Sequence, residues 1–230
     1  MIFGFVLVCD LYMIIAIDGP SGSGKSTLGR MLARALKLLY IDTGSMYRAV
    51  ALAVIDAEID PGDKDAVSAL AGEIEINLEG DPDSLSVLLN GRDVTDLIRT
   101  EKVTEMSSIV STIPGVRRAM VQRQRAISKR DAVLNGRDIG TVVFPDADVK
   151  FFLTAGPEER AERRYKEDQL TSASSATYAE TLADMIERDR RDSSRADSPL
   201  KVADDAIVID STGKSIQQVF EEMMQKISHG

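Results

Sequence analysis

The chain has 230 residues, which is enough for one domain, or one domain with a small insert, around a sizeable core. Charged residues make up 28% and the formal net charge is −9, which argues against a sequence-independent nucleic-acid binder. The single histidine, His229, disfavours histidine-based catalysis and metal binding. The single cysteine, Cys9, excludes an internal disulfide and is typical of a reducing compartment.

Residues 1–17 are mostly apolar, and three interpretations compete. A signal peptide would need basic residues before the apolar run and small residues after it, and neither is present. A membrane-spanning helix would need about 20 apolar residues, and Asp10 interrupts this run. We favour an extension over residues 1–12, with the folded domain beginning at Met13, because the strand and loop that follow are complete from there.

The first part of the folded domain alternates between strand and helix patterns. Residues 13–17 form a short apolar run, which predicts a strand buried on both faces. A Gly/Ser loop follows, and residues 28–35 then carry apolar side chains at helical spacing. A second strand is predicted at 38–41, before a helix capped by Thr43 or Ser45. This alternation predicts crossover units and a parallel sheet.

Residues 61–95 have a different character, because apolar and polar residues alternate at several places. Asn90-Gly91 stands between such stretches, and both residues tolerate positive φ, which is a strong hairpin signal. We therefore expect a small antiparallel insert here.

The remaining segments predict further helices and strands. A long helix is expected after Pro114, and Pro157 suits the first turn of another. Residues 172–175 read as a loop between two arginine-bearing helices, and Ser215 with Gln218 forms a capping-box pattern for the last helix. Further strands are predicted at residues 132–134, 149–153 and 206–209. The expected fold is a three-layer α/β sandwich with a five-stranded parallel sheet and the small insert.

Residues 19–26 match the phosphate-loop pattern G-x-x-x-x-G-K-[ST] at every fixed position. A chance Gly/Ser turn is disfavoured, because a buried strand precedes the motif and an amphipathic helix follows it. The glycines allow backbone N–H groups to wrap around phosphates, and the helix adds its positive end. Lys25 is expected to reach the β- and γ-phosphates of ATP, and the Ser26 hydroxyl to ligate Mg²⁺. The predicted ATP-binding set is Gly19, Pro20, Ser21, Gly22, Ser23, Gly24, Lys25, Ser26 and Thr27.

A phosphate loop is shared by kinases, GTPases, motor ATPases and transporters. The Asn-Lys-x-Asp motif that reads guanine in GTPases is absent from the sequence. A motor or ATPase core usually has a strand that ends in an acidic residue, and the comparable strand here ends in Asn135. Arginines downstream of the loop instead favour a compact kinase that closes over two anionic substrates.

The chain resembles the bacterial cytidylate (CMP) kinases that have an enlarged insert for binding nucleoside monophosphates. The resemblance covers about residues 13–226, and it depends on four motifs at residues 17–26, 42–48, 135–145 and 187–192. It implies γ-phosphoryl transfer from ATP, with Mg²⁺, to CMP or dCMP. It also implies a cytoplasmic monomer that has no nucleic-acid or membrane partner. The implied parts are a core (13–60, 105–155 and 200–230), an insert (61–104) and a lid (156–199).

The resemblance also implies roles for individual residues. The acceptor-site set is Thr43, Tyr47, Ser108, Arg117, Arg137, Asp138, Arg188, Asp192 and Arg195. Arginine suits the phosphate of CMP, and aspartate, serine or threonine can pair with its ribose hydroxyls or cytosine edge. The lid residues expected to stabilise the transferring phosphoryl group, together with Lys25, are Arg160, Arg163 and Arg164.

Several alternatives stay open at the level of sequence. The arginines near Arg160 also fit an ion-paired helix face, and Arg137-Asp138 also fits an internal ion pair. Asn135 stands where related kinases usually carry aspartate, so a carboxylate near the metal would come from Asp18 or Asp138. Rival functions are a kinase for another small acceptor, such as shikimate or dephospho-coenzyme A, and a non-catalytic ATP-binding regulator.

Overall fold

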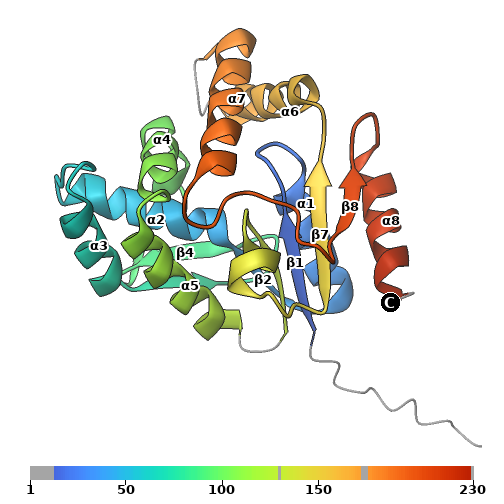
Figure 1. Ribbon diagram of the computed structural model, residues 1–230, viewed down its shortest axis with the longest axis horizontal. Helices are drawn as coiled ribbons and strands as arrows, with labels where there is room; N and C mark the ends of the chain where they lie inside the picture. The colour runs from blue at the N-terminus through green and yellow to red at the C-terminus, as the bar shows by residue number, and fades with distance from the viewer. Residues whose placement is uncertain (1–12, 129–130, 172–175, 229–230) are drawn as a thin grey trace, which may run out of the picture.

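The computed structural model describes residues 13–128, 131–171 and 176–228 (Figure 1). The expected extension at residues 1–12 and the expected loop at 172–175 lie outside the described residues. Within the described residues, no helix combines the length and the apolar character that crossing a membrane would require.

The centre of the molecule is a five-stranded sheet in the order β2-β6-β1-β7-β8. All of its neighbouring strands pair in parallel. The strand bounds are β1 Ile14–Asp18, β2 Leu39–Asp42, β6 Ala132–Asn135, β7 Val149–Thr154 and β8 Ile207–Asp210. This arrangement confirms the predicted parallel sheet. The carboxyl ends of β1, β2 and β6 meet at one edge, where open α/β sheets bind their ligands.

Helices cover both faces of the sheet (Figure 1), as the alternation of side chains along β1 requires. Ile15 and Ile17 pack with α1 (Lys25–Leu36) and α8 (Ile216–Ser228) in one core cluster. Ala16, on the opposite face of β1, packs with α2 (Thr43–Asp56) and α5 (Pro114–Ser128) in the other. The three-layer sandwich therefore has a separate apolar core on each side of the sheet.

The start of α2 corrects one detail of the predicted helix cap. Asp42 is the N-cap residue, and its side chain accepts a hydrogen bond from the Gly44 N–H at 3.1 Å. Thr43 is the first helical residue instead, so its hydroxyl is free to donate to the Asn135 carbonyl at 2.7 Å. The predicted cap of α8 is confirmed, with Ser215 and Gln218 exchanging the two bonds of a capping box.

The insert contains a three-stranded antiparallel sheet, which confirms the predicted hairpin. Asn90 and Gly91 both have positive φ, 49° and 79°, in the turn between the last two strands. A helix that the alternation did not predict, α3, precedes the sheet and packs on α5. The bounds are α3 Lys64–Glu73, β3 Ile76–Glu79, β4 Ser86–Leu89 and β5 Arg92–Asp93, followed by the 3-10 helix η1 Leu97–Arg99 and α4 Glu101–Val110.

Two helices project above the carboxyl edge of the sheet in Figure 1. They are α6 (Pro157–Thr171) and α7 (Tyr178–Ser194), and they pack against each other. Thr177 and Glu180 form a capping box at the start of α7. The π-helix η2 (Ile139–Val143) follows β6 and contacts β1.

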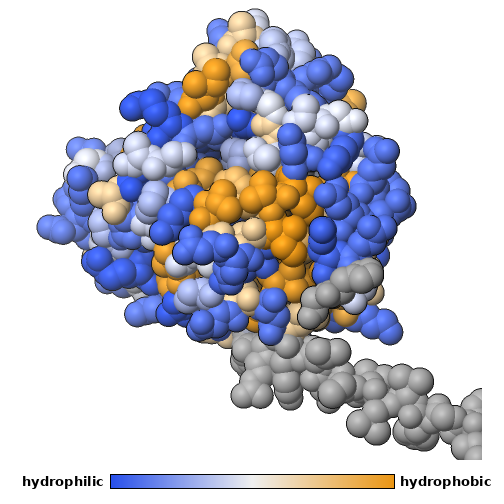
Figure 2. All heavy atoms as spheres, turned by 45° about the vertical axis from the view of Figure 1, so that its right-hand side comes forward, coloured by the Kyte–Doolittle hydropathy of each residue, from blue (hydrophilic) through white to orange (hydrophobic). Residues whose placement is uncertain are grey.

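Hydrophilic residues cover most of the face drawn in Figure 2, and apolar side chains gather near its centre. Among the described residues, large hydrophobic side chains that remain exposed include Val202 and, in β8, Val208. Single exposed apolar residues are normal for a globular surface.

Candidate active site

The phosphate loop joins β1 to α1, as the motif predicted, and its glycines adopt conformations that other residues rarely reach. Gly19 and Gly22 have φ of 143° and 72°. A Cβ atom on Gly19 would lie 2.0 Å from the Leu153 carbonyl oxygen of β7. Glycine is therefore required where the loop passes the neighbouring strand.

Lys25 is the first residue of α1, and its side chain is turned into the loop. The ammonium donates to the Pro20 carbonyl oxygen at 2.5 Å and reaches Ser23 Oγ at 3.5 Å. Burial lowers the pKa of Lys25 well below its ordinary value, and the positive charge of Arg137 adds to this effect. A buried cation with neutral oxygen partners is matched to an anionic ligand.

Ser26 and Asn135 lie together at the carboxyl edge of the sheet. The Asn135 amide donates from Nδ2 to Ser26 Oγ at 3.0 Å. Its Oδ1 atom is buried and has no hydrogen-bond partner in the described part of the chain. An unpaired amide oxygen at this depth is costly unless a ligand or water satisfies it.

The two carboxylates considered as replacements for an acid at position 135 are both engaged elsewhere. Asp18 accepts from the N–H groups of Ile139 and Gly140, each at 2.8 Å, and so holds the start of η2. Burial, opposed by these hydrogen bonds, raises the pKa of Asp18 to about 6. Asp138 pairs with the Arg117 guanidinium.

Three predicted acceptor residues, Arg188, Asp192 and Arg195, lie on α7 or directly after it. Asp192 is the link between them, because its carboxylate takes the Arg137 guanidinium at 2.9 Å and Arg195 at 3.7 Å. Burial opposes the ionised form, but the charges of Arg137, Arg195 and Arg188 lower the pKa of Asp192. Residues 137 and 192, which are far apart in sequence, therefore meet at one place.

A second buried ion pair lies beside Tyr47. The side chains of Arg117 and Asp138 are 3% and 7% exposed, so both charges are removed from water. The Arg117 guanidinium lies 5.8 Å from the centroid of the Tyr47 ring, and it also donates to the Ser111 carbonyl at 3.2 Å. Burial raises the pKa of Tyr47. Arg137 and Asp138 thus have different partners, Asp192 and Arg117, rather than forming a pair with each other.

Ser108 and Thr43 border these groups from α4 and α2. Ser108 Oγ accepts from Arg191 Nη1 at 2.5 Å, which connects α4 to α7. Thr43 Oγ1 donates to the Asn135 carbonyl, which connects α2 to the end of β6. The predicted polar residues therefore lie at the contacts between separate elements.

The arginines predicted for the acceptor site and the phosphate loop lie close enough to affect each other's ionisation. Burial and then the charge of Arg137 lower the pKa of Arg188 to about 10. Arg137 and Arg188 both lower the pKa of Lys25. Such effects require short distances, because charges far apart are screened. Arg188 Nε and Arg195 Nη2 are buried without a hydrogen-bond partner among the described residues, so both arginines keep a donor that an anion could satisfy, although Arg195 Nη1 also lies 3.7 Å from the Asp192 carboxylate.

The three predicted lid arginines have different surroundings. Arg160 lies against the phosphate loop, where Nη1 donates to the Ser21 carbonyl at 3.0 Å and pairs with Asp189 at 2.6 Å. Arg163 donates to Ser211 Oγ at 3.0 Å and pairs with Glu159. Arg164 pairs with Asp168 at 3.0 Å. The ion-paired helix face considered above thus describes Arg163 and Arg164, whereas Arg160 reaches the loop.

Comparison with known proteins assigns the chain that carries these residues to a family. The family model described as cytidylate kinase matches residues 15–229. A cytidylate kinase of Solibacter usitatus is 49% identical over 93% of this chain and 91% of its own length. One of Halalkalibacterium halodurans is 46% identical over 92% of this chain and 96% of its own length. The chain belongs to the cytidylate kinase family.

This family assignment confirms the resemblance inferred from the four motifs. An uncharacterized protein from Eubacterium ventriosum has a solved structure with a TM-score of 0.52 and 11% identity, covering 94% of this chain and 98% of that one. At that identity the likeness concerns the fold alone. The rival functions, a kinase for another acceptor and a non-catalytic regulator, are not favoured.

Arg48 is one residue that the sequence argument did not place in the site. Its Nε atom is buried without a hydrogen-bond partner among the described residues, and Nη2 lies 3.5 Å from the Asp42 carboxylate. Its charge also contributes to the lowered pKa of Arg188. The sequence did contain a signal for Arg48, because this residue ends the 42–48 motif. It also lies one helical turn after Ser45 on α2.

Proposed function

We propose that this member of the cytidylate kinase family transfers the γ-phosphoryl group of ATP to CMP or dCMP, giving ADP and CDP or dCDP. The similar proteins of Solibacter usitatus and Halalkalibacterium halodurans, which carry the name cytidylate kinase, support this assignment. The observation that carries it is that Arg160 of α6 donates to the Ser21 carbonyl of the phosphate loop at 3.0 Å and also pairs with Asp189 of α7 at 2.6 Å, so the helix that bears Arg188 and Asp192 lies beside the loop. It supports one cleft that holds both phosphate groups.

On the donor side, the amides of the phosphate loop and the start of α1 would hold the triphosphate, with Lys25 on its β- and γ-phosphates. Ser26 Oγ and the unpaired Oδ1 of Asn135 are neutral oxygen donors, and Mg²⁺ prefers oxygen ligands. Ser26 would hold the metal, and Asn135 would orient a water on it. When bound, Mg²⁺ would neutralise charge on the transferring phosphates.

On the acceptor side, arginines that keep an unpaired nitrogen would bind the monophosphate. Arg188, Arg195 and Arg48 each have a buried nitrogen that lacks a partner in the described chain. Asp192, held ionised by Arg137, is suited to accept hydrogen bonds from ribose hydroxyls. The remaining candidates for the nucleoside are Thr43, Tyr47, Ser108 and the Arg117–Asp138 pair.

The reaction needs positioning and charge stabilisation more than proton transfer, because the attacking group is already a phosphate oxygen. Arg160 is the lid residue best placed to stabilise the transferring group, since it already contacts the Ser21 carbonyl of the loop. All three lid arginines would have to exchange their present carboxylate partners, which are Asp189, Glu159 and Asp168, to take part.

The test is a steady-state assay of the purified protein with ATP and Mg²⁺ against CMP, dCMP, UMP, AMP, shikimate and dephospho-coenzyme A. We expect CMP and dCMP to have the highest kcat/KM. A preference for any of the other acceptors, or ATP binding without turnover, would contradict the proposal.

A further inference from the structure

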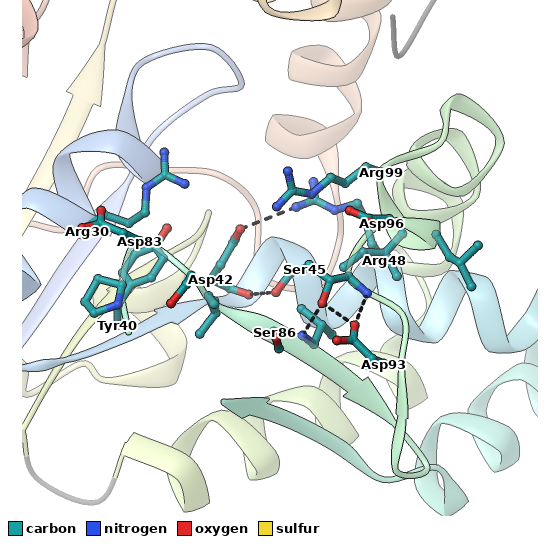
Figure 3. Close-up of a pocket in the computed structure, with 17 residues that line it drawn as sticks. Arg30, Tyr40, Asp42, Ser45, Arg48, Asp83, Ser86, Asp93, Asp96 and Arg99 are labelled. Atoms are coloured by element: carbon teal, nitrogen blue, oxygen red, sulfur yellow. Dashed lines mark hydrogen bonds and ion pairs between the residues drawn. The ribbon is translucent and has the colours of Figure 1, made fainter. Parts of the chain in front are cut away.

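A cavity of about 650 Å³ lies between the core and the insert (Figure 3). Its core wall consists of side chains from α1, β2 and α2, among them Arg30, Asp42 and Arg48. Its opposite wall comes from the segment before β4 and from the end of the insert around η1, which contributes Arg99. The cavity is distinct from the Lys25 loop but adjoins it, because Arg30 lies one turn after Ser26 on α1.

The carboxylates of this cavity are mostly engaged. Asp83 pairs with Arg34, which does not line the cavity, at 2.6 Å. Asp93 accepts both the N–H and the hydroxyl of Thr95, at 2.9 and 2.6 Å. Asp42 caps α2 and lies 3.5 Å from Arg48. These three acids are therefore not free to neutralise further cations, and a fourth, Asp96, also lines the cavity.

The guanidinium groups are much less completely paired. In the described residues, neither the Arg30 nor the Arg99 side chain makes a hydrogen bond or an ion pair. Arg48 has only the 3.5 Å contact with Asp42, and its Nε is buried without a partner in that same part of the chain. Figure 3 shows Arg30 on one side of Asp42, with Arg48 and Arg99 on the other side. The cavity thus offers several guanidinium donors to an anion.

Arg99 is carried on a firmly anchored segment of the insert. Ile98, its neighbour in η1, is 2% exposed, and its N–H donates to the Val94 carbonyl at 3.0 Å. The helix η1 packs directly on α2, the helix that carries Arg48. Arg48 of α2 and Arg99 of η1 therefore line the same space from adjoining elements.

We propose that Arg99 is a further binding residue for the acceptor phosphate, contributed by the insert and acting together with Arg48 of the core. This inference rests on the proposed function. The ligand class is the dianionic phosphate of a nucleoside monophosphate, which guanidinium groups bind through paired hydrogen bonds.

The test compares Arg99→Ala with Arg92→Ala, a matched control on β5 of the same insert. Arg92 is exposed, does not line the cavity, and has only a 3.7 Å ion pair with Asp56. We expect Arg99→Ala to raise the KM for CMP at least about tenfold, the loss typical of a hydrogen bond to a charged group. The KM for ATP should not change, and Arg92→Ala should match the wild type in both constants.

Binding of cytidine, which lacks the phosphate, separates a phosphate contact from a general disturbance of the insert. Arg99→Ala should weaken CMP binding and leave cytidine binding unchanged, and Arg99→Lys should restore part of the CMP affinity. An unchanged KM for CMP, or equal weakening of CMP and cytidine, would overturn the role of Arg99 and leave the proposed function intact. Absence of CMP turnover by the wild type would instead overturn the proposed function, and this inference with it.

Discussion

At the scale of single residues, the site is a set of buried charges whose partners come from distant parts of the chain. The sequence was enough to predict the phosphate loop, because its glycines, Lys25 and Ser26 are adjacent in the chain and all serve to bind the phosphates and their metal ion. It could not predict that Asp18 would accept from two amides of η2, or that Asp138 would pair with Arg117. Those partners are set by how strands and helices pack, which local spacing does not determine.

Lys25 is the residue on which the donor side depends most. Lys25→Ala should reduce kcat by roughly 100-fold or more, the typical effect of removing a group that stabilises transition-state charge. The fold should persist, because the ammonium is a buried cation whose removal relieves a desolvation cost. Turnover and thermal unfolding measured on the same preparation check both parts. Near-normal turnover would contradict the role assigned to Lys25.

The raised pKa of Asp18 leads us to expect that the stability of the protein depends on pH. Its pKa is raised from 3.8 to about 6, so between these values the folded state binds more protons than the unfolded state. The contribution of Asp18 to the free energy of unfolding therefore falls as pH rises through this window. At roughly 1.4 kcal/mol per pKa unit, the loss is about 2–3 kcal/mol between pH 4 and pH 7.

Urea unfolding of the wild type and of Asp18→Asn isolates this effect, because asparagine does not titrate. The stability of the wild type relative to the variant should fall as pH rises. Asp93→Asn serves as the control with the opposite sign, since hydrogen bonds from Thr95 lower the pKa of Asp93. A difference between wild type and Asp18→Asn that is flat or rises with pH would contradict the account.

At the scale of elements, the parallel strands were predictable because each is a short apolar run bounded by turn residues. Two helices were missed for a physical reason. In α3 only Val67 and Ala71 are buried, so its apolar stripe is too sparse to recognise. In α4 two of the buried residues are serines, Ser107 and Ser108, which conceals the inward face. Packing on α5 and α2 supplies the stability that these sequences do not indicate locally.

The hairpin of the insert gives a test of one predicted element. Gly91 has φ of 79°, so Gly91→Val should lower the free energy of unfolding by about 1–2 kcal/mol, the cost of a left-handed conformation for other residues. Gly72→Ala in α3 is the matched control, because neither glycine has a neighbour within 4 Å of an added Cβ. That control should stabilise the protein by about 0.5–1 kcal/mol, since alanine favours a helix interior. If urea unfolding gave Gly91→Val the same free energy of unfolding as the wild type, this turn geometry would be refuted.

At the scale of the whole molecule, the fold brings cations from several separate parts of the chain to the carboxyl edge of one sheet. The loop after β1, the end of β6, α7 and α2 each contribute, and the insert adds Arg99 under the further inference. Sequence motifs identified most of these residues one by one. Their mutual distances depend on the strand order β2-β6-β1-β7-β8, which connects segments more than 100 residues apart. The strand order depends on how the whole chain packs, so no single motif predicts it.

The central claim is that one cleft holds the phosphates of both nucleotides. Titration calorimetry with adenosine and cytidine joined 5′ to 5′ through five phosphates tests it directly, because this molecule can fill both halves only if they adjoin. We expect one molecule to bind per chain, far more tightly than ATP or CMP alone, and Lys25→Ala and Arg188→Ala each to weaken it. Binding no tighter than that of ATP, or two molecules per chain, would contradict the single cleft.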